Sequence, residues 1–294
     1  MAITFNNLGD CTTDSIGSGR VDCNVDAGLL IGFILTPRSW KLDTVSGTFT
    51  KANYETLVKN GTFIPYTGLF NFEQTNEENV TETAPNTGAI SIIRSGLPSF
   101  TFTFNDGNCF HKSLYNKQGN RNYNLILVFE KGLKLVKSGD DLRGYGINSI
   151  SVSSYMEKTS ESAKSVVTVQ LDSAEDYNMN SVILANDGDL GFKPADINGV
   201  IEANLIIGTN TATSIPVKIT SSCNSSVGFS GLDDLSNFTL INNSTGATVT
   251  PTAVSEGANG NYTITGTALP TANFTLLLNA TDDLDQFYKG KAVK

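Results

Sequence analysis

The chain has 294 residues, with 29 Asp and Glu against 20 Lys and Arg, which gives a formal net charge of −9. This length predicts one large domain or two ordinary ones. The acidic balance excludes a protein that wraps DNA or coats an anionic membrane, because both need a cationic surface. No run of about 18 apolar residues is present, so no transmembrane helix is expected. The opening MAITFNNLGD contains no readable secretory signal, and we expect a soluble protein made in the cytoplasm with no membrane partner.

Cysteines stand at positions 11, 23, 109 and 223, and no two of them form a CxxC pair. Four cysteines scattered over a chain of this length do not make a disulfide framework, because a large core needs no covalent staples. A bridge between Cys11 and Cys23 around a small loop is one alternative. The favoured interpretation is that all four are reduced, semi-buried thiols.

Catalytic chemistry finds little support in the sequence. His111, in CFHKSL, is the single histidine, and a catalytic triad also needs a nucleophile and a carboxylate that the spacing does not supply. Neither a G-x-S-x-G elbow nor a phosphate-binding G-x-x-x-x-G-K-[ST] loop is present. We therefore assign no catalytic and no cofactor-binding residue, and we expect no enzyme activity.

Three acidic pairs offer oxygen ligands to calcium, but none continues into the spaced carboxylates of an EF-hand loop. They are Asp187-Gly188-Asp189, Asp233-Asp234 and Asp282-Asp283. One histidine and unclustered cysteines do not build a zinc site. Because aspartate beside glycine is typical of turns, we expect loop tips here and no metal or cofactor.

The residues TKANYETLVKN, at positions 50–60, predict a short helix. Thr50 is a suitable N-cap and Asn60-Gly61 a suitable end, with Tyr54 and Leu57 on an apolar stripe. We expect this to be the one helix of the N-terminal part, packed on a sheet.

The other segments of the N-terminal part alternate in the manner of strands. Ser99–Phe104 puts three phenylalanines on one face and hydroxyls on the other, and an Asn-Asp-Gly turn follows. The run NLILVF, at 124–129, suits a strand covered on both faces. Segments 146–153 and 164–171 are predicted to complete a β meander.

The amino-acid composition changes near residues 186–196, which are rich in turn-forming residues. The remaining hundred or so residues hold short strands between turn signals, as in an immunoglobulin-type β-sandwich. These strands are expected at 199–207, 215–221, 237–241, 247–254, 261–266 and 272–278. The predicted fold is therefore mainly β: a sandwich or barrel-like domain over 1–194 with one short helix, then an Ig-like sandwich over 195–294. The second domain has 8 acidic and 4 basic residues and the first 21 and 16, so their charges are −4 and −5.

The segment FTLINNSTGATVTPTAVSEGANGNYTITG resembles bacterial and phage Ig-like modules, in which a Gly/Asn-rich turn precedes a strand written Tyr-Thr-Ile-Thr. In this chain that strand is Tyr262–Thr265. The resemblance implies that Tyr262 lies near the position of the tyrosine corner, although the Cys–Trp–Cys spacing of antibody domains is missing.

The N-terminal part resembles a tail tube subunit of a tailed phage. The likeness lies in the run TGLFNFEQTNEENVTETAPNTGAISIIRSGLPSFTFTFNDG and the following NLILVFEKG. Tube subunits with an appended Ig-like domain form a known class, and the domain order here matches it. The resemblance implies a structural virion protein, located in the tail and assembled in the host cytoplasm, that forms stacked rings around a DNA conduit and displays its Ig-like domain outside. Its partners would be copies of itself, other tail or virion proteins, DNA passing without specific binding, and host surface glycans.

Physical reasoning supports such a role independently. A ring of subunits needs sheet edges that join neighbours, so edge pairing becomes the means of assembly. An acidic lumen repels phosphates and lets DNA pass. Charged residues are only 17% of the chain, and polar uncharged surfaces suit subunits that pack against copies of themselves.

Two segments are candidates for contact with neighbouring subunits. The first is an acidic loop at 72–88 that orders on contact with the next ring, for which a solvated surface loop is the alternative. The second is a Gly- and Asp-rich N-terminal arm at 9–28. The charged residues of the loop are Glu73, Glu77, Glu78 and Glu82, and those of the arm are Asp10, Asp14, Arg20 and Asp22.

Two other functions remain as alternatives. One is a capsid auxiliary or decoration protein, whose N-terminal domain grips the shell. The other is a carbohydrate-binding adhesin module, which needs an aromatic platform. Trp40 is the single tryptophan, between Arg38 and Lys41, and it is better explained as a core or interface residue.

Overall fold

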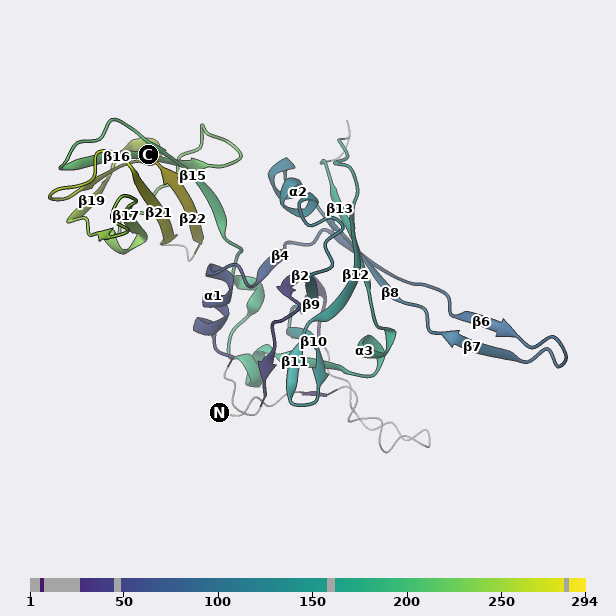
Figure 1. Cartoon of the computed structure of the whole chain (residues 1–294). Helices are drawn as coiled ribbons and strands as arrows, with labels where there is room; N and C mark the ends of the chain where they lie inside the picture. The colour runs from purple at the N-terminus through teal and green to yellow at the C-terminus, as the bar shows by residue number, and fades with distance from the viewer. Residues whose placement is uncertain (1–5, 8–26, 45–48, 158–161, 283–285) are drawn as a thin grey trace. The chain divides into compact units, whose positions relative to one another are not determined.

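The structure is a computed structural model in which the chain divides into two compact units, shown in Figure 1. Unit 1 is Met1–Asp196 and unit 2 is Ile197–Lys294. Both are built mainly of strands, as the sequence predicts. Their identities as a tube domain and an Ig-like domain remain predictions. The structure describes residues 6–7, 27–44, 49–157, 162–282 and 286–294.

Unit 1 contains a large antiparallel sheet with the strand order β1-β14-β10-β9-β12-β13-β8-β5. Four strands lie off this path. Strand β2 pairs with β9, β4 pairs with β2, and β11 pairs with both β10 and β3. Strands β6 and β7 form a separate hairpin. The bounds are β1 Asn6–Asn7, β2 Leu30–Pro37, β3 Leu42–Asp43, β4 Ile64–Thr67, β5 Asn71–Asn76, β6 Val80–Thr83, β7 Ile90–Arg94, β8 Pro98–Phe104, β9 Tyr123–Phe129, β10 Gly132–Ser138, β11 Asp141–Arg143, β12 Tyr145–Val152, β13 Ser165–Leu171 and β14 Ser181–Ala185.

The four strands expected around residues 99–171 all form, and β9, β12 and β13 lie side by side in the predicted order. Only the position of β8 differs from the predicted meander. Strand β8 pairs with β13 and not with its sequence neighbour β9. One edge of β9 is taken by β2, and the other by β10 and β12 in turn. Because both edges of β9 are occupied, β8 is placed three strands away from it.

The sheet of unit 1 curls so that its apolar face folds back on itself and encloses one core. Strands β2 and β8 are four ladder steps apart, or roughly 19 Å in a flat sheet at about 4.8 Å per strand. Yet the rings of Phe33 and Phe102 have centroids only 4.5 Å apart. The core contains Phe100, Phe102 and Phe104, each 0% exposed. The phenylalanine face of β8 therefore points inward, as its alternation predicts.

Three α-helices lie in the described part of unit 1, whereas the sequence predicted one. Helix α1, Lys51–Lys59, begins as expected, because the Thr50 hydroxyl accepts a hydrogen bond from the Asn53 amide. Helix α2, Asn108–Tyr115, was missed because it follows Gly107 directly and has no side-chain cap. Helix α3, Ala174–Asn178, is short. Within the described part of the chain, no helix is both long and apolar enough to cross a membrane.

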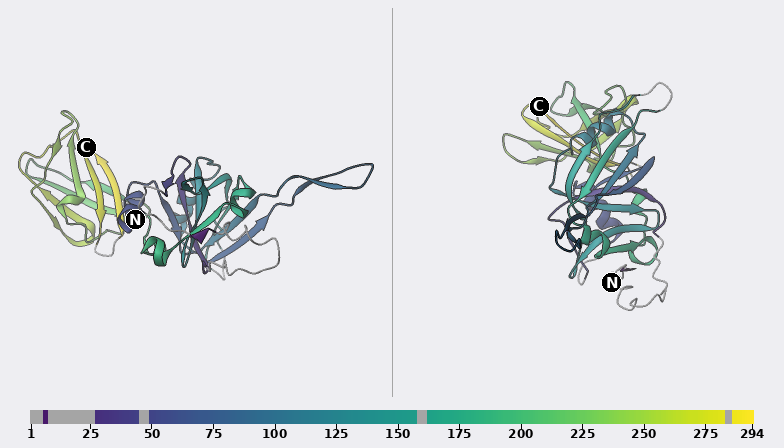
Figure 2. Two further views of the ribbon diagram at one scale, coloured as in Figure 1. Left: turned by 90° about the horizontal axis from the view of Figure 1, so that it is seen from below. Right: turned by 90° about the vertical axis from the view of Figure 1, so that its right-hand side faces the viewer.

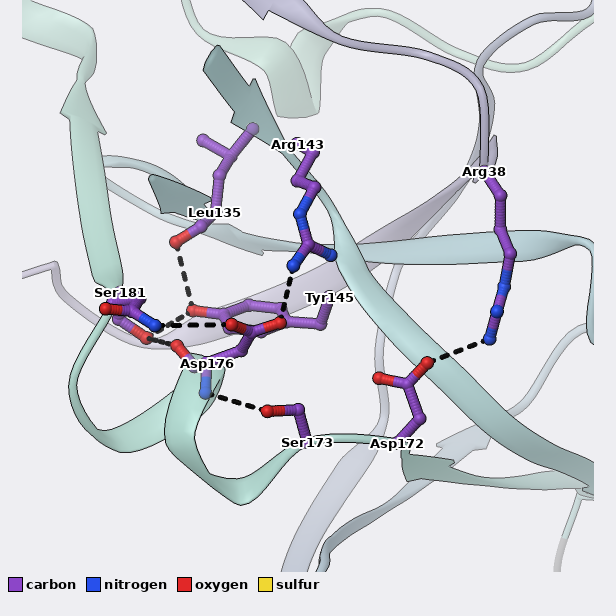
Figure 3. A network of polar contacts seen from close by, with 9 residues as sticks. Arg38, Leu135, Arg143, Tyr145, Asp172, Ser173, Asp176 and Ser181 are labelled. Atoms are coloured by element: carbon purple, nitrogen blue, oxygen red, sulfur yellow. Dashed lines mark hydrogen bonds and ion pairs between the residues drawn. The ribbon is translucent and has the colours of Figure 1, made fainter. Parts of the chain in front are cut away.

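A buried polar network fixes α3 against the sheet (Figure 3). Arg143 on β11 and Asp176 on α3 form an ion pair with 2.7 Å between Nη2 and Oδ2. The hydroxyls of Tyr145 and Ser181 lie 2.6 Å apart, and the Tyr145 hydroxyl also donates to the Leu135 carbonyl. Burial raises the pKa of Tyr145, so this hydroxyl stays protonated and keeps its role as a donor.

Unit 2 is an eight-stranded structure with the order β18-β17-β21-β22-β15-β16-β20-β19. All its pairs are antiparallel except β15 with β22. Short 3-10 turns occupy Pro194–Asp196 at the unit boundary, and Leu235–Asn237 and Ala258–Gly260 within unit 2. The bounds are β15 Ile201–Ile207, β16 Ser214–Ser221, β17 Phe238–Asn242, β18 Thr248–Val249, β19 Ala253–Glu256, β20 Asn261–Thr265, β21 Phe274–Thr281 and β22 Phe287–Val293.

The strand predicted at 247–254 is in fact two strands at opposite ends of this order. Residues Thr248–Val249 pair with β17, whereas Ala253–Glu256 pair with β20. Pro251 lies between them, and proline interrupts a ladder because it lacks an amide proton. Only residues 250–252 connect β18 and β19, which lie at opposite ends of the strand order. The strands must therefore curl around the core into a sandwich-like arrangement.

Tyr262 anchors the interior of unit 2. Its side chain is 1% exposed, and its hydroxyl donates to the Phe229 carbonyl at 2.9 Å and accepts from the Leu232 amide at 3.3 Å. The tyrosine therefore fixes backbone upstream in the sequence, as a tyrosine corner does. The loop that it fixes is more distant in the chain than the few residues of the antibody motif.

We expect Tyr262→Phe to lower the free energy of unfolding of unit 2 by about 1–3 kcal/mol, because it leaves a buried carbonyl and a buried amide without their partner. Urea unfolding of the full chain, followed by circular dichroism, measures this as an earlier transition. Tyr115→Phe is the matched control, because Tyr115 is 54% exposed. Equal transitions for the two variants would contradict this role of Tyr262.

Lys134 on β10 has its ammonium 4.0 Å from the centroid of the Tyr177 ring, and burial lowers its pKa to about 8. Between pH 8 and 10.5 the unfolded chain binds the extra proton, so this lysine makes stability rise with pH in that window. Lys134→Met should therefore stabilise the chain at pH 7 by about 1–3 kcal/mol and have little effect at pH 10. Thermal unfolding at both values checks this, with exposed Lys112→Met as control. A destabilised variant at pH 7 would show that the ring contact outweighs the burial.

Candidate assembly interface

Residues 72–88, predicted as a long acidic loop, are largely strand, so the prediction is wrong in form. Strand β5 carries Glu73 and strand β6 carries Glu82, while Glu77 and Glu78 lie in the link between them. The segment is ordered because each half finds a pairing partner, β8 for the first and β7 for the second. The four glutamates spread along the segment and form no cluster. Their role in subunit contact stays a prediction.

Strands β6 and β7 form an arm that projects from the body of unit 1, as both figures of the whole chain show (Figures 1 and 2). Among the strands that the structure describes, these two pair only with each other. The tip turns through Gly88, whose φ of 67° favours glycine. An isolated two-stranded hairpin is marginally stable in water, so we expect the arm to gain stability from a partner.

The arm exposes large apolar side chains. Ile90, Ile92 and Ile93 on β7 are 70%, 62% and 63% exposed, and Val80 on β6 is 41% exposed. Ile90 and Ile92 share one face of the ribbon with two threonines of β6. Exposed isoleucines on a projecting ribbon make the arm a candidate interaction site.

The root of the arm is held by a group of hydrogen bonds between its two legs. The Glu77 carboxylate pairs with Arg94 at 3.1 Å and accepts from the Leu97 amide at 3.4 Å. The Asn79 side chain accepts from the Gly96 amide at 2.8 Å. A Cβ on Gly96 would collide with the Glu77 carbonyl oxygen, so only glycine permits this approach. These contacts set the direction in which the arm leaves the sheet.

The outer surface of β12, β13, β8 and β5 is a polar sheet face, which we call the hydroxyl face. It consists of three cross-strand rows, defined by the printed register of the four strands. The rows are Ser149-Gln170-Ser99-Thr75, Ser151-Thr168-Thr101-Glu73 and Val166-Thr103-Asn71. Thr101 and Thr168 have hydroxyl oxygens 3.1 Å apart. The only charge in these rows is the carboxylate of Glu73.

Strand β5 closes one end of the main sheet. Among the described strands it pairs only with β8, so its outer edge presents unpaired backbone groups. Five of its six residues are exposed, and it contains no proline. Such an edge is a ready template for a strand from another chain.

The remaining predicted residues do not gather at this interface. The N-terminal arm, with Asp10, Asp14, Arg20 and Asp22, lies outside the described residues, as do Cys11 and Cys23. Cys109 and Cys223 are exposed and disulfide-bonded, which corrects the expectation of reduced, semi-buried thiols. Their positions at a helix start and in a loop favour exposure over packing.

His111 and the acidic pairs show no catalytic or metal-binding arrangement within the described residues. His111 lies on α2 with its Nδ1 buried and unpartnered. No group of three metal-binding side chains occurs there. Asp189, Asp234 and Asp282 instead accept local backbone hydrogen bonds, from Ala185, Ser236 and Gln286, as turn chemistry predicts.

Trp40 is half-buried and packs against an aromatic cluster of unit 1. Its ring centroid lies 4.8 Å from that of Phe63 and 6.3 Å from that of Phe49. Tyr54 of α1 and Phe192 complete the cluster. This supports the interpretation of Trp40 as a core residue.

Sequence reasoning missed the exposed isoleucines of β7 and the close approach at Gly96, two residues after β7. The signal was present as ISIIR after the turn Pro-Asn-Thr-Gly, facing the strand-like VTET. An apolar strand with a polar hairpin partner, and no other strand beside it, predicts an exposed apolar surface.

No model of a known protein family matches the chain, and no curated protein matches it. Among solved structures, it is similar to a chain in the virion of a native gene transfer agent particle, with 15% identity, a TM-score of 0.25, and coverage of 38% of this chain and 85% of that chain. It is also similar to a chain in the tail of an empty gene transfer agent particle of C6 symmetry, with 14% identity, a TM-score of 0.27, and coverage of 51% and 95%. A likeness this weak carries no argument about function.

Gly96→Ala should displace the two legs of the arm, because the added Cβ meets the Glu77 carbonyl. Arg94 is the only lysine or arginine between residues 60 and 111. Trypsin can therefore cut this part of the chain at one bond only, the bond after Arg94. We expect cleavage after Arg94 to become several-fold faster while the thermal unfolding of the chain changes little. Gly107→Ala is the control, since its Cβ would enter open space. Identical cleavage rates for the two variants would show that Gly96 does not hold the arm.

Proposed function

We propose that this chain is a structural virion protein, the tail tube subunit of a tailed phage, which assembles into stacked rings around a DNA conduit. The observation that carries the proposal is the two-faced sheet of β12, β13, β8 and β5. One face is a buried phenylalanine and valine core, and the other is the hydroxyl face, which contains no lysine or arginine in its three rows.

The hydroxyl face suits the wall of a conduit. DNA carries a dense line of phosphates, and lysine or arginine on the wall would hold it in place. Hydroxyl and amide side chains offer phosphates only neutral hydrogen bonds, which water can replace, and the Glu73 carboxylate repels them. Lys164 lies one row beyond this face, with its ammonium 4.8 Å from the Phe70 ring centroid, and at the opposite end Arg38 is paired with Asp172 at 2.9 Å. The face therefore offers passing DNA little to bind.

The edge of β5 and the arm provide two distinct contacts for assembly. A neighbour that adds a strand to β5 would continue the sheet sideways, and repetition of that contact closes a ring. The arm reaches well beyond the sheet, so it is suited to contact a subunit that does not share that edge. Burying each isoleucine of the arm would contribute about 1–2 kcal/mol per contact.

We expect the triple variant Ile90→Ser, Ile92→Ser and Ile93→Ser to stay monomeric, because it removes the apolar contacts of the arm and leaves the core of unit 1 unchanged. Electron microscopy and sedimentation velocity measure assembly, and thermal unfolding verifies folding. The control replaces Leu29, Met179 and Val227 by serine, since these exposed apolar residues lie outside the arm.

The native chain and the control should form hollow tubes. Tubes formed equally by the arm variant would overturn the role of the arm. A native chain that stays monomeric and binds only preformed capsids would overturn the tail tube function and support a decoration protein instead.

A further inference from the structure

We propose that one sheet face of unit 2 binds an anionic polysaccharide, through lysines that the strand register brings together. Unit 2 contains four lysines and no arginine, at positions 218, 289, 291 and 294. Lys289 and Lys291 alternate along β22, and Lys218 lies on β16. We call the surface formed by Lys218, Lys289 and Lys291 the lysine face.

The register places these three lysines on the same side of the sheet. Strand β15 runs between β16 and β22, with Ile206 opposite Lys218 and Glu202 opposite Lys289. The same parallel register, continued, brings Ile206 opposite Val293. On the other side of β22, Asn279 is opposite Lys289. Residues in register on adjacent strands share a face, so all these side chains point to one surface.

The ammonium groups of the lysine face are available to a ligand. Lys289 and Lys291 are exposed and Lys218 is half-buried. Within the described residues, none of the three forms a hydrogen bond or an ion pair. Lys294, by contrast, donates to the Gly208 carbonyl at 2.6 Å. Three unpaired cations on one face of a unit that is acidic overall form a local positive patch.

The positive and negative side chains of unit 2 therefore lie mostly on different surfaces. Of its described acidic residues, only Glu202 lies on the lysine face. Asp233, Asp234 and Glu256 lie in loops or on β19, and the Asp282 carboxylate accepts from the Gln286 amide and the Tyr288 hydroxyl. A polyanion that meets this unit is attracted to one side and repelled from the others, which defines the orientation of binding.

The uncharged residues of the face favour a carbohydrate over other polyanions. The side chains of Asn204 and Asn279 are exposed, and their amide groups make no hydrogen bond among the described residues. They are therefore available to bind hydroxyl groups. Exposed Ile206 and Val293 provide a small apolar area for the face of a sugar ring. No exposed aromatic ring occupies the positions in register here, so stacking with the bases of a single-stranded nucleic acid is not available.

The geometry also fits an extended chain with repeated charges. Lys289 and Lys291 are about 7 Å apart along β22. Lys218 lies two strands away, about 10 Å to the side, and about 7 Å further along the strand direction than Lys291. A flexible polymer with a phosphate or a carboxylate on each repeat can contact all three cations at once. Each contact is weak in water, so several together are needed for binding, and salt should abolish it.

Binding of the full-length chain to immobilised polymers tests the proposal. The probes are phosphorylated dextran, polygalacturonate as the carboxylate polymer, neutral dextran, and polyglutamate. We expect binding to one or both anionic polysaccharides in about 20 mM salt, loss of that binding in about 500 mM salt, and none to neutral dextran. The two anionic polysaccharides decide whether phosphate or carboxylate is preferred.

The decisive variant is Lys218→Gln, Lys289→Gln and Lys291→Gln in combination, which should weaken binding by about tenfold or more. The matched control is Lys112→Gln, Arg121→Gln and Lys193→Gln, which removes the same charge from exposed positions of unit 1. Equal binding by the two variants would overturn the proposal. A native chain that binds neither anionic polysaccharide at low salt would also overturn it. Equally tight binding to polyglutamate would show recognition of charge alone and overturn the assignment of a carbohydrate. None of these outcomes depends on tube assembly, so the two proposals fail separately.

Discussion

The fold of unit 1 depends on strand β8, which has apolar side chains on one face and hydroxyl side chains on the other. In β8 the phenylalanines at 100, 102 and 104 are fully buried, while the hydroxyls at 99, 101 and 103 face outward. Contact between Phe33 and Phe102 requires the sheet to curl, because the two strands are far apart in the ladder. The curl then encloses the apolar face and leaves the hydroxyl face open. The same alternation therefore produces both the core and the surface on which the proposed function rests.

A subunit of an assembly must keep some of its binding surface unsatisfied until it meets a partner. In this chain the unsatisfied groups are the backbone edge of β5 and the isoleucines of the arm. The hydrogen bonds around Glu77 and Gly96 hold the two legs of the arm together, which would reduce the entropy lost on contact in the proposed assembly. Charge is used sparingly on these surfaces, in agreement with the low charged fraction of the sequence.

Local sequence signals predicted the elements whose stability is local. Thr50 marked the start of α1, and alternation marked β8, because cap and period act within a few residues. Helix α3 carried a similar signal that was overlooked: Ser173 accepts from the Asp176 amide. The break at Pro251 was also readable, since proline interrupts a strand.

Features that depend on long-range pairing were not available to the same reasoning. The position of β8 beside β13 depends on which strands occupy the edges of β9. The polar composition of residues 72–88 suggested a loop, although pairing with β8 and β7 makes most of it strand. The lysine face likewise exists only through the register of three strands, because Lys218 and Lys289 are far apart in the sequence. The exposure of Cys109 and Cys223 was not apparent from their sparse spacing.

A cryo-electron microscopy reconstruction of the assembled full-length chain tests the central claim most directly, because it shows which face of the sheet borders the lumen. The account predicts hollow tubes in which the row from Ser151 to Glu73 lines the channel and the arm contacts another subunit. Tubes in which this row faces outward or is buried between subunits would contradict it.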